Sequence, residues 1–138
     1  MDGRPAASRL AVGERFTRRA SFDADSIRSF ATLCGDHNPL HVNEEFARSK
    51  GFLGRVVYGG LLVAKVSQLI GMRLPGQDSV WTALSLDFRK PLYIEEAAQV
   101  TGTVDAVSES GGIVRLKLVL RAGEKLLAKG KAEVVIGQ

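Results

Sequence analysis

The chain has 138 residues, of which 45% are hydrophobic, and its formal net charge is +4. That length supports one good hydrophobic core and is too short for two. The basic residues stand singly or in pairs instead of along one helix, which argues against nucleic acid as a partner. No uninterrupted apolar stretch reaches the length of a membrane span.

We expect residues 1–11 to form a flexible N-terminus and residues 12–138 a single domain. The first ten residues are small, polar and basic, without the apolar stretch of a signal peptide. Cys34 is the only cysteine, so an intrachain disulfide is impossible and a reducing compartment fits the chain. These features together predict a cytoplasmic protein.

The first expected elements are a short strand over residues 15–20 and a helix capped by Asp23. Gly35 is well placed to end this helix, which puts Asp36 immediately after a helix terminus. The apolar face of the helix follows the i, i+3, i+4, i+7 spacing, and we expect it to be buried. Its members are Ile27, Phe30, Ala31 and Cys34.

The segment from Gly35 to His41 reads Gly-Asp-His-Asn-Pro-Leu-His and combines a carboxylate with an imidazole. Proline disfavours the helical conformation for the residue before it, so Asn38 should be extended or in a turn. In a continuous helix Asp36 and His41 would point to different sides. Bent around Pro39, they can face one cavity. An acid/base pair held in a rigid loop suits proton transfer, because both groups must reach the reacting atoms in fixed geometry.

Two further helices are expected after this bend. Asn43 can cap a short one, which has acidic residues in its first turn and basic residues near its end. The segment 60–74 is apolar on most of its circumference, which is typical of a helix enclosed by other structure. Pro75 and Gly76 should stop it.

The rest of the chain has the alternating pattern of strands. Apolar and other residues alternate in segments that begin at Leu84, Val100, Val114 and Ala128. Turn sequences at 110–112 and 122–124 predict hairpins, and hairpins make the strands antiparallel. We therefore predict an α+β fold in which an antiparallel sheet wraps around the long apolar helix.

Some apolar residues fall on strand faces that do not grip this helix. They are Val107, Val119, Leu127 and Val135. A second copy of the sheet edge could cover some of them, so we expect a homodimer.

The chain resembles the MaoC-like hydratases, the (R)-specific enoyl-CoA hydratases of the hot-dog fold, over roughly residues 12–136. The resemblance rests on Asp-His-Asn-Pro-Leu-His at 36–41, on Val-Tyr-Gly-Gly-Leu-Leu at the entry to the long helix, and on the Phe-x-x-Pro segment that ends at Pro91. It implies a hot-dog fold and a lyase that adds water syn across a trans-2-enoyl-CoA thioester, or runs the reverse dehydration. The implied product is the (R)-3-hydroxyacyl-CoA.

The resemblance also implies roles for individual residues. Asp36 and His41 would be the catalytic pair, acting on a water between them, and Asn38 would orient the loop or the water. Ser67 would match a family serine that hydrogen-bonds near the histidine. The Gly59 amide would bind the thioester oxygen, and this role has independent physical sense because helix N-termini stabilise an oxyanion.

The chain departs from the family at Tyr58, because the family usually has His-Gly where this chain has Tyr58-Gly59. The sequence leaves open whether the tyrosine only shapes the pocket or changes the oxyanion site. Arg89 and Lys90, at a strand end, could meet the phosphates of coenzyme A or could simply be solvated.

Simpler interpretations exist for each candidate. Asp36 alone could be an ordinary turn residue, Asn38 an Asx-turn residue and Ser67 a small helix-interface residue. The Asp-His-x-x-x-His spacing could suggest a metal site, yet one cysteine and no further histidine leave a zinc set incomplete. We therefore expect no metal and no redox cofactor. Two rival functions are an acyl-CoA thioesterase and a non-catalytic acyl-CoA-binding module, since one fold hosts several functions.

Overall fold

The computed structural model describes residues 10–137, and in this part of the chain five strands and four helices are found. The strands are β1 (Arg15–Ala20), β2 (Ser79–Phe88), β3 (Ala98–Val107), β4 (Ile113–Ala122) and β5 (Lys125–Ile136). The helices are α1 (Ala24–Cys34), α2 (Pro39–Val42), α3 (Glu44–Ser49) and α4 (Gly59–Met72).

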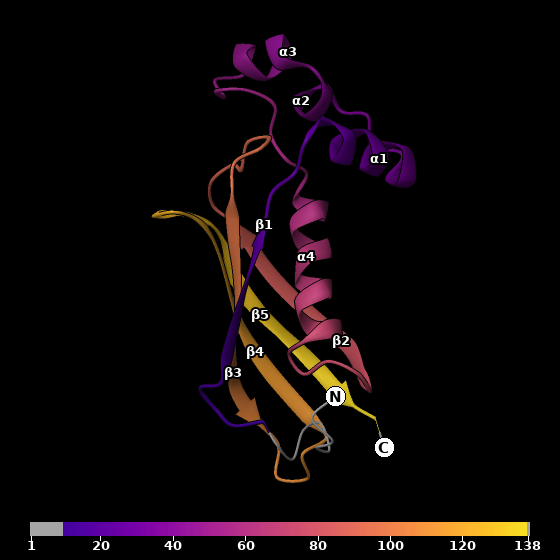
Figure 1. Cartoon of the computed structure of the whole chain (residues 1–138), viewed down its shortest axis with the longest axis vertical. Helices are drawn as coiled ribbons and strands as arrows, with labels where there is room; N and C mark the ends of the chain where they lie inside the picture. The colour runs from indigo at the N-terminus through magenta and orange to yellow at the C-terminus, as the bar shows by residue number, and fades with distance from the viewer. Residues whose placement is uncertain (1–9, 138) are drawn as a thin grey trace.

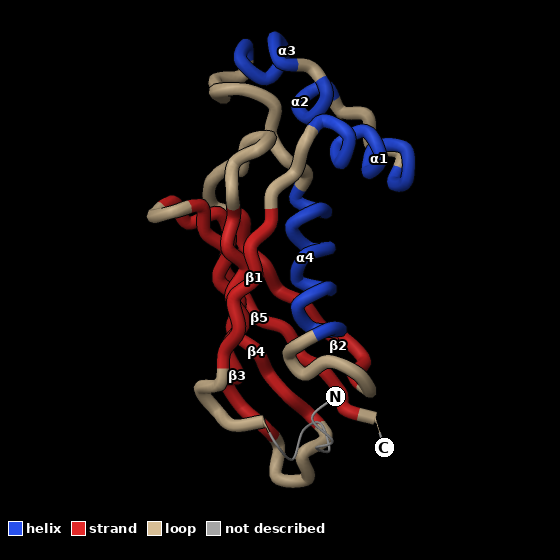
Figure 2. The backbone as a smooth tube through the Cα atoms, viewed as in Figure 1, coloured by secondary structure: helices blue, strands red, loops and turns tan. Residues whose placement is uncertain are grey.

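The strands form one antiparallel sheet in the order β1-β3-β4-β5-β2, so β1 and β2 are its edges. Helix α4 lies along one face of the sheet and contacts β1, β2 and β3 (Figure 1). The short helices α1, α2 and α3 gather beyond one end of the sheet, near the start of α4 (Figure 2). The predicted α+β hot-dog arrangement, an antiparallel sheet around a long central helix, is confirmed.

The core fills the space between α4 and the sheet. Helix α4 contributes Leu62, Val66, Leu69 and Ile70, all buried. The facing strands contribute alternate residues, which is why β4 reads buried at every second position. The buried strand residues include Val100, Val104, Val114, Leu116, Leu118, Leu120 and Val134. Each buried aliphatic side chain of this size contributes about 1.5–3 kcal/mol to stability, so α4 is firmly fixed on the sheet.

Helix α1 begins and ends where the sequence predicts. The Asp23 carboxylate accepts a hydrogen bond from the Ser26 N–H at 2.8 Å, and Gly35 ends the helix with a φ of 80°. Ile27 and Ala31 are buried as expected. The prediction that Cys34 belongs to the core is wrong, because it is the last residue of α1 and is exposed, past the end of the buried stripe.

Of the apolar residues predicted to lie on strand faces that do not grip α4, the one at Leu127 in β5 was predicted wrongly. Leu127 is buried, with 0% of its surface exposed. The register of the β4–β5 pair shifts between Leu120 and Arg121, and such a bulge interrupts the alternation that the prediction assumed. Val135 is exposed, whereas Val107 and Val119 are half-buried.

The start of the described chain is anchored. Of the predicted flexible segment 1–11, residues 1–9 lie outside the described residues, and Leu10 packs against the core. Between residues 10 and 137, no helix has the length and hydropathy needed to cross a membrane.

The backbone of β2 lies against Gly130 of β5 and leaves no room there for a side chain. A Cβ at Gly130 would overlap the backbone carbonyl of Ser85. No side-chain rotation can relieve a clash with backbone, so we expect Gly130→Ala to lower the free energy of unfolding by about 2 kcal/mol or more.

Gly71→Ala is the matched control, because a Cβ there, in α4, meets nothing within 4 Å. Because alanine has a higher helix propensity than glycine, we expect Gly71→Ala to raise the free energy of unfolding by about 0.5–1 kcal/mol. Urea unfolding measures both variants, and equal midpoints for the two would contradict the close approach at Gly130.

Candidate active site

The loop that carries the predicted catalytic pair is held by two successive side-chain hydrogen bonds. The Asp36 carboxylate accepts from the Asn38 N–H at 3.0 Å, and the Asn38 side chain accepts from the Leu40 N–H at 3.0 Å. Asn38 has φ −55° and ψ 127°, so the predicted bend before Pro39 is confirmed. Pro39 then opens α2, where its missing N–H costs nothing. Asn38 thus fixes the loop by capping a helix.

His41 lies in α2 with its ring orientation fixed. Its Nδ1 is 2.6 Å from the carbonyl oxygen of Val56. Because a carbonyl only accepts, Nδ1 carries a proton, and in the neutral imidazole Nε2 is then a free acceptor. The His41 backbone carbonyl accepts from Nε of Arg55 at 2.9 Å. The ring therefore has the tautomer that a general base at Nε2 needs.

Tyr58 connects the two members of the pair. Its ring stacks on that of His41, with centroids 3.9 Å apart and an interplanar angle of 27°. Its hydroxyl donates to the backbone carbonyl of Asp36 at 2.5 Å. The backbone carbonyl of Asp36 and the ring of His41 consequently lie within the span of one side chain. Sequence reasoning missed these contacts, and their only signal was the departure from the family residue.

The Tyr58 hydroxyl is held in its protonated form. Only 2% of the residue's surface is exposed, and burial raises the pKa of Tyr58 above its ordinary value of 10.0, with the charge of Asp36 as a second cause. Hence the hydroxyl donates its hydrogen bond throughout the neutral pH range.

Gly59 begins α4 at a helix end that no side chain caps. Tyr58, the N-cap residue, makes no side-chain capping hydrogen bond, and the first N–H groups of a helix lack intrahelical acceptors. The ring of Phe88 lies against Gly59, because a Cβ there would come within 3.0 Å of its Cζ. The missing side-chain cap leaves the positive end of α4 available to a developing negative charge.

A cavity of about 380 Å³ brings His41 and Gly59 together. Its walls are mostly apolar, and two basic residues complete the lining. The lining consists of His41, Phe52, Val56, Val57, Gly59, Leu62, Phe88, Arg89, Lys90, Pro91 and Leu92. Asp36 is exposed and is not among the lining residues. The space can hold an acyl chain beside the imidazole.

The structure does not bring Ser67 to this group. Ser67 lies in α4 eight residues after Gly59, which is about 12 Å along the helix axis. It is exposed and does not line the cavity. Within residues 10–137 its hydroxyl has no hydrogen-bond partner, so the contact with the histidine that the resemblance implied is not found there.

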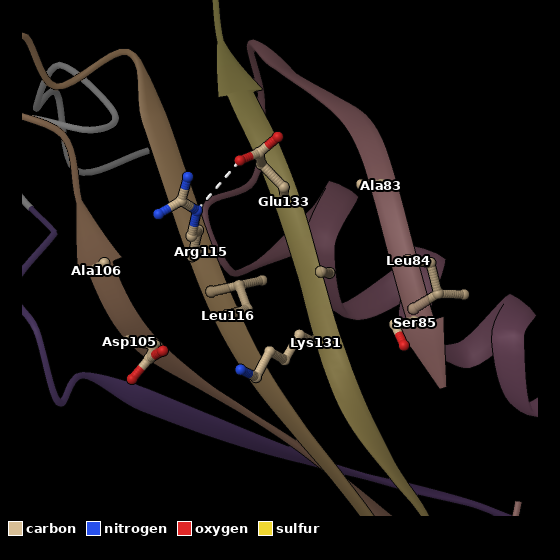
Figure 3. A pocket seen from close by; sticks show the side chains of 10 residues that line it. Ala83, Leu84, Ser85, Asp105, Ala106, Arg115, Leu116, Lys131 and Glu133 are labelled. Carbon is tan, nitrogen blue, oxygen red and sulfur yellow. Dashed lines mark hydrogen bonds and ion pairs between the residues drawn. The ribbon is translucent and has the colours of Figure 1, made fainter. Parts of the chain in front are cut away.

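A second hollow, of about 420 Å³, lies across β2, β3, β4 and β5 and contains none of the predicted site residues (Figure 3). The charged side chains that line this hollow lie at strand positions that alternate with the buried residues. Arg115 and Glu133 form an ion pair there at 3.2 Å, and Asp105, which also lines it, pairs with Lys117 at 3.5 Å. Because its lining carries two acidic and two basic side chains and thus no net charge, this hollow is the weaker candidate.

Comparison with known proteins gives concordant matches. Residues 8–119 match the family model described as the MaoC like domain. The chain is 33% identical over 129 residues to the (R)-specific enoyl-CoA hydratase of Aeromonas caviae, covering 93% of this chain and 96% of that protein.

A solved structure of the (R)-hydratase from A. caviae has a TM-score of 0.89 and 32% identity, covering 93% of this chain and 98% of that one. The mitochondrial 3-hydroxyacyl-[acyl-carrier-protein] dehydratase of Arabidopsis thaliana is 34% identical over 99 residues, which is 72% of this chain and 57% of that protein.

Proposed function

The chain belongs to the MaoC-like domain family, and from this membership and the geometry of the site we propose that it is an (R)-specific enoyl-CoA hydratase. The reaction is the addition of water across a trans-2-enoyl thioester, or the reverse dehydration of a 3-hydroxyacyl thioester. The observation that carries the proposal is the Asp36–Tyr58–His41 arrangement, next to the uncapped start of α4.

In the proposed mechanism, Asp36 and His41 act on one water molecule. The free acceptor on Nε2 suits His41 to take a proton as the water oxygen bonds to C3. The electrons of the C2–C3 double bond move toward the thioester oxygen, where the Gly59 N–H stabilises the enolate-like charge. The pair then carries one extra proton and delivers a proton to C2, so that the elements of water are added and no other reactant is consumed.

Incubation of the purified protein with crotonyl-CoA tests this function. We expect the enoyl absorbance to disappear without release of free thiol, because water adds to the double bond and the thioester stays intact. Thiol release would instead establish a thioesterase. Tight binding without any turnover would establish a non-catalytic acyl-CoA-binding module.

The basic rim of the cavity supports a coenzyme A thioester as substrate. Arg89 and Lys90 line the cavity and are exposed, and Arg89 forms an ion pair with Asp87 at 3.8 Å. We expect the Arg89→Ala/Lys90→Ala double variant to raise KM for crotonyl-CoA about 2- to 30-fold, since exposed ionic contacts contribute about 0.2–1 kcal/mol each. Steady-state kinetics at low ionic strength measure this change.

The matched control is Lys129→Ala/Lys131→Ala, which removes the same charge from exposed positions of β5 that do not line this cavity. Crotonyl-pantetheine, which lacks the nucleotide phosphates, should show the same KM with both double variants. An unchanged KM for crotonyl-CoA in the rim variant would contradict recognition of the phosphates.

A homodimer is part of the proposal, and the edge strand β2 supports it. Val80, Leu84 and Phe88 on this strand are 59%, 36% and 52% exposed, and an uncovered apolar edge favours pairing with a second copy. Sedimentation of the purified chain tests this assembly. The cytoplasmic location and the absence of a metal or redox cofactor stay predictions.

A further inference from the structure

Building on the proposed hydratase function, we propose that Tyr58 is a positioning residue that fixes Asp36 relative to His41. The hydroxyl of Tyr58 donates to the Asp36 carbonyl, while its ring stacks on His41. The residue touches neither attacking water nor thioester in this scheme. It acts through Asp36 and His41, the two groups that act on the water.

Four parts of the chain meet at Tyr58. The ring of Phe30 in α1 lies 4.9 Å away, centroid to centroid, at an interplanar angle of 56°. The loop after α1 provides the Asp36 carbonyl, and α2 provides the His41 ring. Tyr58 itself is the N-cap of α4, directly before Gly59. One buried side chain therefore relates both acid/base groups to the helix end that would hold the thioester oxygen.

The hydroxyl of Tyr58 contributes more to the positioning of Asp36 than the ring of Tyr58 does. In the described chain, the other hydrogen bond of Asp36 is local, from the Asn38 N–H two residues further on. The bond from Tyr58 spans 22 residues and is the link between this exposed loop and a buried element. Without it, we expect the turn held by the Asn38 N–H to loosen and the carboxylate to shift relative to the imidazole. A displacement near 1 Å can cost about 10²-fold in rate.

Tyr58→Phe isolates this hydrogen bond, because it keeps the stacked ring and removes only the oxygen. We expect kcat on crotonyl-CoA to fall about 10- to 100-fold with KM changed by less than about twofold, the pattern of an interaction made for the transition state. Tyr93→Phe is the matched control: Tyr93 is the only other tyrosine. Its hydroxyl accepts from the Leu53 N–H at 3.2 Å, and it does not line the cavity. We expect its kcat to equal that of the wild type.

Amide exchange at Asn38, measured by NMR, gives a readout that does not depend on activity. We expect faster exchange of the Asn38 N–H in Tyr58→Phe, because the loop that holds it is loosened, and unchanged exchange in Tyr93→Phe. Wild-type exchange at Asn38 in Tyr58→Phe would overturn the proposal, as would an unchanged kcat. A wild-type protein with no hydratase activity would refute the proposed function, whereas the exchange rates would still decide the role of Tyr58.

Discussion

Asp36→Asn should lower kcat for crotonyl-CoA hydration by about 10²–10⁴-fold, the usual contribution of a general acid or base. The asparagine side chain keeps an oxygen that can accept from the Asn38 N–H, so the turn that holds the loop should survive. The variant loses only the ability to exchange a proton. Initial rates measure the effect, and the thermal midpoint shows whether the fold is intact.

Asp105→Asn is the control for this variant, because Asp105 is an exposed carboxylate on β3 that pairs with Lys117 at 3.5 Å. It should retain the wild-type rate. Near-wild-type turnover by Asp36→Asn would remove Asp36 from the mechanism.

His41→Gln is the second substitution with a large expected effect, again about 10²–10⁴-fold on kcat. The glutamine amide can still donate to the Val56 carbonyl, which His41 contacts at 2.6 Å. It cannot take up a proton near neutral pH, so the free acceptor of the imidazole is lost. Steady-state rates on crotonyl-CoA measure the loss.

The other histidine provides the matched comparison. His37 is exposed and lies in the same motif, and His37→Gln should leave kcat unchanged. If both glutamine variants lost activity equally, the effect would belong to the loop as a whole and not to His41.

The parts of the fold that could be predicted depend on neighbours in the sequence. Asp23 and Gly35 delimit α1 because a cap and a left-handed residue act within one helical turn. The same holds for Asn38 and Pro39, whose bend follows from the geometry of the residue before a proline. Alternation predicted the strands, and the apolar circumference of 60–74 predicted the enclosed helix.

The parts that were missed depend on contacts between distant residues. Val56 accepts from His41 across 15 positions, and nothing in the sequence marks a backbone carbonyl as a partner. The burial of Leu127 follows from a register shift between β4 and β5, which strand alternation alone does not reveal. The role of Ser67 came from resemblance alone, and in the described chain this residue is exposed and does not line the cavity that contains His41.

The configuration of the product tests most directly whether Asp36 and His41 hydrate the double bond as one pair. Crotonyl-CoA would be incubated with the wild-type protein in deuterium oxide, and NMR would then assign C2 and C3 of the product. We expect (R)-3-hydroxybutyryl-CoA with the deuterium at C2 on the same face as the new hydroxyl, because one pair of groups both activates the water that adds to C3 and delivers the deuteron to C2. An (S) product, deuterium on the opposite face, or free crotonate would contradict this mechanism.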